Sequence, residues 1–176
     1  ASAHAPGTGA AAVIRIGFMP MLLLLAACAS PGASTTSEAP SSTQVAPERM
    51  LATIRAAAGS EHGELAVVPL RDAAVEHHRQ RAQTFEDERR YRDAAAELDH
   101  ALQVLPDDPG LLQERAEMAV ALGDYTQAET LARRAWQLGS QVGPLCRRHW
   151  ATVRQARYAA RDGAAAAHAQ QQLQAC

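Results

Sequence analysis

The sequence predicts an all-α protein built from paired helices, and three observations carry this prediction. Alanine is abundant while aromatic residues make up only 4% of the chain, a composition that favours close helix packing over a β-sheet core. Residues 89–108 and 123–142 share a pattern of small and apolar residues at a shift of 34 positions. A further stretch, residues 144–175, has two helical segments around a short turn at 161–163.

The first segment, residues 1–27, is interpreted as a secretory signal peptide. Arg15 precedes an apolar run at 16–27, and this run is too short to span a bilayer, because a spanning helix needs about 20 apolar residues. A positive charge followed by a short apolar stretch and small residues is the layout of an export signal. Translation from Val13 would give a compact leader, so residues 1–12 are interpreted as an artefact in front of the natural start.

The end of the leader carries a more specific motif. Leu25-Ala26-Ala27-Cys28 resembles the bacterial lipobox, in which a leucine and two small residues precede the cysteine that is lipidated. The resemblance implies acyl chains on Cys28 and a stable membrane anchor. Ala29, where aspartate would retain the protein in the inner membrane, implies the outer membrane. In the alternative interpretation the signal peptide is an ordinary one and Cys28 is incidental.

A tether and a short helix are predicted to follow. Residues 29–47 are almost entirely Ala, Ser, Thr, Pro and Gly, so they bury too little apolar surface to fold and should form a disordered tether. The next residues place Met50, Leu51 and Ile54 on one helix face, a stripe so small that we expect the helix to be loosely docked or mobile. The predicted organisation is a leader (1–27), a lipidated cysteine with its tether (28–47), a short helix with an extended connector (48–74) and a helical domain (75–176).

The repeated segments carry the positions of a known repeat family. The aligned pairs are Tyr91 with Tyr125, Ala94 with Ala128, and Ala101 with Ala135. The two alanines of each copy lie seven residues apart, so they share a helix face on which small side chains permit close approach. This period and these positions resemble the tetratricopeptide repeat (TPR). The resemblance implies a short TPR-like α-solenoid of about three repeats over residues 75–176.

The turns between paired helices differ among the copies. Gly123-Asp124 is typical of the family, since glycine ends a helix in the left-handed conformation and aspartate caps the next one. Arg89-Arg90 stands at the same place in the first copy. This departure is expected to cost a little stability at that turn.

The TPR resemblance implies a binding function, because the first helices of such repeats line a groove that takes peptides or helices from partners. The corresponding positions here are Glu76, Arg79, Gln83 and Glu86 in the first copy and Gln113, Glu117 and Val120 in the second. Their mixed charge favours a polar, peptide-like ligand. For any single one of them, an ordinary solvated helix face is the alternative interpretation.

Two cysteines remain once Cys28 is assigned to lipid. Cys146 precedes Arg161 by 15 residues, and Cys176 follows Asp162 by 14 residues. Antiparallel helices around that turn would bring the two cysteines face to face, as a disulfide requires. Because export favours oxidation, we predict a Cys146–Cys176 disulfide.

A zinc site is the alternative for these cysteines. His149 lies three residues after Cys146, and His168 lies in the neighbouring predicted helix, so Cys and His ligands of the kind that zinc prefers are present. His168 is about two helical turns from Cys176, however, and the four side chains would not easily converge. We therefore predict neither a metal nor a cofactor.

The sequence carries no nucleophile–base motif, phosphate-binding glycine loop or metalloprotease motif, so an enzyme is not expected. The net charge of −2 gives no reason to expect a nucleic-acid partner. The predicted function is that of an outer-membrane-anchored periplasmic lipoprotein that acts as a protein-interaction scaffold or assembly factor for an envelope complex. The alternative is a small structural lipoprotein without a peptide ligand that forms homo-oligomers through the apolar residues of its first helix.

Overall fold

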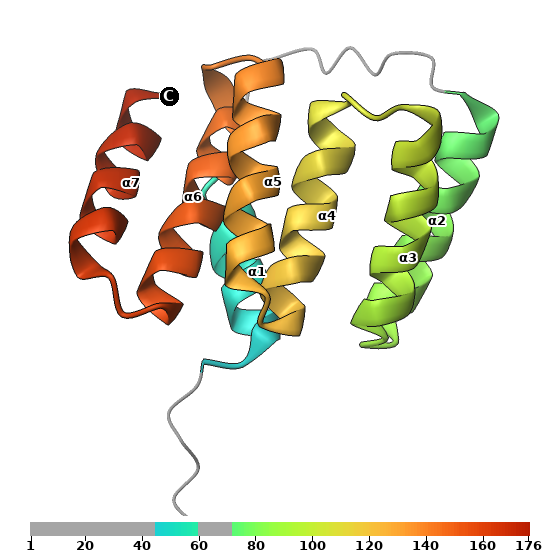
Figure 1. The fold of residues 1–176 in the computed structure, drawn as a ribbon, viewed down its shortest axis with the longest axis horizontal. Helices are drawn as coiled ribbons and strands as arrows, with labels where there is room; N and C mark the ends of the chain where they lie inside the picture. The colour runs from blue at the N-terminus through green and yellow to red at the C-terminus, as the bar shows by residue number, and fades with distance from the viewer. Residues whose placement is uncertain (1–44, 60–71) are drawn as a thin grey trace, which may run out of the picture. The chain divides into compact units, whose positions relative to one another are not determined.

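The computed structural model describes residues 45–59 and 72–176, which form helices throughout and contain no strand (Figure 1). The helices are α1 (Pro47–Ala56), α2 (Ala73–Asp87), α3 (Tyr91–Val104), α4 (Pro109–Leu122), α5 (Tyr125–Leu138), α6 (Gly143–Ala159) and α7 (Gly163–Ala175). The predicted all-α fold is confirmed.

Several predicted features lie outside the described residues. They are the signal peptide, Cys28, the tether up to residue 44 and most of the connector after α1. Within the described ranges, each helix is too short or too polar to cross a membrane.

Six helices form three consecutive antiparallel pairs, α2 with α3, α4 with α5, and α6 with α7 (Figure 1). Neighbouring pairs pack on each other through α3 and α4 and through α5 and α6. This arrangement is the short α-solenoid of about three repeats that the sequence predicts.

Alanines let the helices of each pair approach closely. Ala94 and Ala101 in α3, and Ala128 and Ala135 in α5, have no solvent-exposed surface. Ala166 in α7 is equally buried, so the third pair follows the same rule despite its weaker sequence match. Small side chains at these positions bring helix axes near to each other and leave little empty space.

Each pair turns on one residue in the left-handed conformation, with φ of 59° at Arg89, 79° at Gly123 and 60° at Arg161. Aspartates begin the second helices of the last two pairs. The Asp124 and Asp162 carboxylates each accept a hydrogen bond of 3.0 Å from the backbone N–H three residues further on. These caps satisfy N–H groups that the helix itself leaves unpaired.

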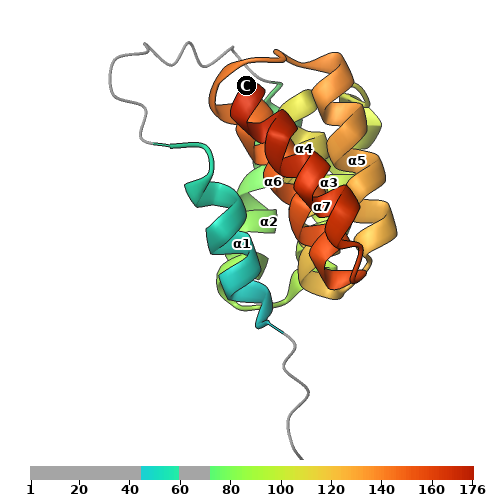
Figure 2. The ribbon, with the colours of Figure 1, turned by 90° about the vertical axis from the view of Figure 1, so that its left-hand side faces the viewer.

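Helix α1 stands outside the three pairs and packs across α4 and α6. Figure 2 shows α1 on one side of these two helices and α5 on the other. The side chains of Met50, Leu51 and Ile54 are at most 5% exposed. The expectation of a loosely docked or mobile helix therefore differs from the structure, because α4 and α6 offer a matching apolar surface that includes Val120 and Ala151.

Candidate protein-binding groove

The face of α2, α4 and α6 that carries α1 is called the inner face below. Helix α1 divides it into two parts. In the covered half, α1 lies on α4 and α6. In the open half, a pocket of about 530 Å³ lies between α1, α2 and α4.

The open half contains all four groove residues that the sequence predicts for the first copy. Helix α2 contributes the wall formed by Glu76, Arg79, Gln83 and Glu86. The opposite side is formed by Arg55 of α1, by Ala58 just after this helix, and by Glu114 and Met118 of α4. The pocket is thus bounded by charged and amide side chains together with apolar ones, among them Leu98 and Met118.

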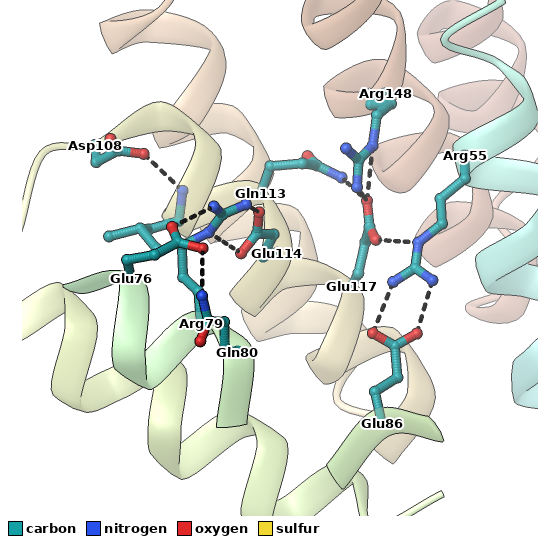
Figure 3. A network of polar contacts seen from close by, with 11 residues as sticks. Arg55, Glu76, Arg79, Gln80, Glu86, Asp108, Gln113, Glu114, Glu117 and Arg148 are labelled. Atoms are coloured by element: carbon teal, nitrogen blue, oxygen red, sulfur yellow. Dashed lines mark hydrogen bonds and ion pairs between the residues drawn. The ribbon is translucent and has the colours of Figure 1, made fainter. Parts of the chain in front are cut away.

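Arg79 is the central cation of the open half. Its Nε donates to Glu114 Oε2 at 3.0 Å, and Nη2 donates to the other oxygen of the same carboxylate. Nη1 donates to Glu76 Oε2 at 3.2 Å. These bonds, with Glu114 the stronger partner, outweigh partial burial and raise the pKa of Arg79. The guanidinium therefore stays charged and fixes α2 to α4 across the pocket floor (Figure 3).

A second network joins α1 to α2 and α4 through Arg55 (Figure 3). Arg55 Nη1 and Nη2 pair with the two oxygens of Glu86 at 2.7 and 3.0 Å, and Nε donates to Glu117 Oε2 at 2.8 Å. Burial opposes the charge of Arg55, but the two carboxylates raise its pKa overall. The Glu117 side chain has no exposed surface, so these pairings compensate a carboxylate that is removed from water.

The other oxygen of Glu117 is held from within the repeats. Gln113 Nε2 donates to Glu117 Oε1 at 2.8 Å, and Arg148 Nε donates to it at 3.1 Å. Gln113 Nε2 also donates to Thr152 Oγ1 at 2.8 Å, so α4 and α6 share one buried polar network. Gln113, Glu117 and Thr152 have no exposed surface, so hydrogen bonds within the protein replace those that water would make.

His149 completes this network from α6. Its Nδ1 lies 2.8 Å from Gln113 Oε1, and since that oxygen can only accept, Nδ1 carries the proton. Burial, with a smaller contribution from Arg148, lowers the pKa of His149 to about 4. The neutral imidazole is thus a fixed hydrogen-bond donor between helices at neutral pH.

The groove residues predicted for the second copy lie in the covered half. Gln113, Glu117 and Val120 are at most 1% exposed, so no partner reaches them while α1 is docked. The sequence prediction did not include Arg55 or Arg148. The signal for Arg55 is its position directly after Ile54, at the edge of the apolar stripe of α1.

The two remaining cysteines lie together at the end of the last pair. Cys146 and Cys176 form a disulfide with a Cα–Cα distance of 5.8 Å. The Gly143 N–H also donates to the Cys176 carbonyl at 2.9 Å, so the end of α7 is tied to the start of α6 twice. Within the described part of the chain, no group of three or more His, Cys, Asp or Glu side chains is arranged to hold a metal ion.

Comparison with known proteins adds one finding. No protein-family profile and no curated protein matches the chain. Among solved structures, the globular C-terminal domain of P. aeruginosa LpoP is similar, with a TM-score of 0.56 and 32% sequence identity. The match covers 59% of this chain and 98% of that domain. The chain belongs to the family of this LpoP domain.

Proposed function

We propose that this chain is an outer-membrane lipoprotein, anchored through Cys28, whose periplasmic domain binds a protein partner on the open half of its inner face. The membership of its helical domain in the family of the P. aeruginosa LpoP C-terminal domain supports this proposal. The lipobox-like sequence before Cys28 independently supports the anchor.

The observation that carries the binding role is the pocket of about 530 Å³ beside α2. Glu76, Arg79, Gln83 and Glu86 recur along α2 at spacings of three and four residues, so they present one continuous polar stripe. Gln83 is exposed, and its amide can both donate and accept hydrogen bonds. Such a stripe suits a polar peptide segment of a partner.

The chemistry of the pocket favours binding over catalysis. Among the described residues that line it, there is no serine, cysteine or histidine. Two of its arginines, Arg55 and Arg79, are already paired with carboxylates, and these carboxylates raise the pKa of both. These two guanidinium groups stay charged and are suited to hold a polar ligand.

The burial of α1 argues against the alternative of self-association through that helix. This alternative uses the apolar residues Met50, Leu51 and Ile54 as a dimer contact. All three are buried within the chain. These residues are therefore not available as a dimer contact while α1 is docked.

Site-specific photo-crosslinking in intact cells tests the binding role. A photoreactive amino acid at Gln83 in the open half should label one envelope protein. The matched control is Thr130, which is exposed on α5 and lines no part of the pocket. Equal labelling from both positions would contradict binding at the inner face.

The anchor has its own test. Cys28→Ser should abolish incorporation of labelled fatty acid and move the protein from the outer-membrane fraction to the soluble periplasmic fraction. Unchanged fractionation of this variant would refute anchoring through Cys28.

A further inference from the structure

We infer that the covered half of the inner face is a helix-binding site that α1 occupies in cis, and that a partner helix of the same chemistry exchanges with α1 there. This inference rests on the proposed function, because it takes the inner face to be the surface that a partner uses. It adds a second subsite and specifies the kind of segment that fits it.

The polar part of the site selects for an arginine. Within the three helix pairs, Gln113 and Arg148 occupy Glu117 Oε1. Glu117 Oε2 receives its hydrogen bond from Arg55 of α1 at 2.8 Å. Because the carboxylate is fully enclosed, its second oxygen favours a cation as the incoming group. A guanidinium matches this geometry, since it can bond to this oxygen and to both oxygens of Glu86.

The apolar part of the site selects for an amphipathic helix. Met50 and Ile54 pack with Val120 and Ala151 of α4 and α6, and Arg55 follows Ile54 directly. The end of α1 is held by Arg147, whose Nε donates to the carbonyls of residues 57 and 58 at 3.2 and 3.0 Å. Because these are backbone carbonyls, any helix ending there could supply them. The occupant is thus a short helix with an apolar stripe that ends in an arginine.

The attachment of α1 is suited to exchange. It has 10 residues, and Ala46 provides no side-chain cap at its start; isolated helices shorter than about 12–15 residues are marginal in water. The contacts among α2 to α7 form an unbroken series without α1. Helix α1 can therefore leave as a unit while the solenoid retains its own packing.

Competition between α1 and a free copy of its sequence tests the inference. A fluorescent peptide of residues 45–59 is titrated against the purified full chain, against Ile54→Asp, which removes α1 from the site, and against Thr53→Asp. Thr53 is exposed on the opposite side of α1, so its variant controls for charge. Ile54→Asp should bind the peptide at least about tenfold more tightly than the other two proteins, because its site is vacant. An Arg55→Ala peptide should bind about tenfold more weakly.

Equal affinities for the three proteins, or no binding by a folded Ile54→Asp chain, would overturn the inference. If circular dichroism shows that Ile54→Asp has lost the helices of the solenoid, hydrogen exchange on the unaltered chain decides. Faster exchange in α1 than in α4 supports exchange of α1, and equal rates refute it. The crosslink from Gln83 is measured separately, so the open-half proposal stands or fails independently.

Discussion

The covered and open halves of the inner face use the same kinds of side chain in opposite ways. In the covered half, the Glu117 side chain is 0% exposed and is held from three helices. In the open half, Glu114 and Arg79 are 25% and 27% exposed, and Glu76 is 42% exposed. Equivalent helix faces of neighbouring repeats therefore differ mainly in whether another helix covers them.

This difference determines what each half can contribute. Ion pairs near the surface contribute about 0–1 kcal/mol, so those of the open half are able to rearrange around a ligand at little cost. Removing one partner of a buried carboxylate strongly destabilises the folded protein. The polar contacts of the covered half therefore hold α4 and α6 in a fixed arrangement. The open half is thus adaptable and the covered half is rigid unless α1 is replaced by an equivalent helix.

The largest expected effect comes from removing the disulfide that ties α6, one of the two helices beneath α1, to α7. Cys146→Ser with Cys176→Ser removes the disulfide that ties α6 to α7 across 30 positions. The loss in unfolding free energy should be about 3–4 kcal/mol, measured by urea denaturation. Reductant should weaken the unaltered chain by a similar amount and leave the double variant unchanged. An unaltered chain insensitive to reductant would show that the bond is absent in solution.

The next effect is a pH dependence from His149 in the covered half. Its pKa in the folded state is about 4, against 6.5 as the ordinary value. Between these values the unfolded chain binds a proton that the folded chain does not, so stability falls as pH falls from 6.5 toward 4. The loss is on the order of 3 kcal/mol, measured by urea unfolding across this range.

A matched pair of variants isolates this contribution. His149→Gln keeps a donor but cannot titrate, so it should flatten the pH dependence between 6.5 and 4. His168 is exposed, and His168→Gln should leave the dependence as it is. The same slope in all three proteins would exclude His149 as its source.

A smaller effect compares the two halves directly. Glu117→Gln and Glu114→Gln each remove one carboxylate from α4, at positions three residues apart on its inner face. Glu117→Gln should lower the free energy of unfolding by about 2–3 kcal/mol, because it removes the carboxylate partner of Arg148 and leaves Arg55 paired with Glu86 alone. Glu114→Gln should cost less than about 1 kcal/mol. Similar costs would mean that burial under α1 does not distinguish the halves.

The sequence predicted well those features that depend on residues close together in the chain, such as helix pairs and turns. The repeat period located the helix pairs, and the spacing around Arg161-Asp162 placed Cys146 opposite Cys176. The first turn also forms where expected, although Arg89 adopts φ of 59° without being glycine. There, Arg90 stands at the capping position without a side-chain cap, and its guanidinium instead stacks over Phe85 at 4.3 Å and bonds to Asp93.

The position of α1 could not be predicted in the same way. A stripe of three apolar residues shows which face of a helix is buried but not which surface buries it, and Arg55 is separated from Glu117 by 62 positions. Helical register correctly put Glu76, Arg79 and Gln83 along one pocket. It could not indicate that the equivalent residues of α4 lie under a segment from before the repeats.

The smallest expected effect tests how geometry, rather than charge, distinguishes the two halves. Arg55→Lys and Arg79→Lys each keep a positive charge but lose the planar fork that joins two carboxylates. Arg55 reaches an enclosed oxygen of Glu117 while it also pairs with both oxygens of Glu86, and one ammonium group cannot do both. The cost in unfolding free energy should be about 1 kcal/mol for Arg55→Lys and about 0.5 kcal/mol or less for Arg79→Lys, whose partners are accessible to water.

Thermal denaturation of both lysine variants at two salt concentrations checks this prediction. Added salt should reduce the Arg79→Lys difference more than the Arg55→Lys difference, because Glu76 and Glu114 are more exposed than Glu86 and Glu117. An Arg55→Lys difference that falls equally with salt would argue against the enclosure of the Glu117 carboxylate.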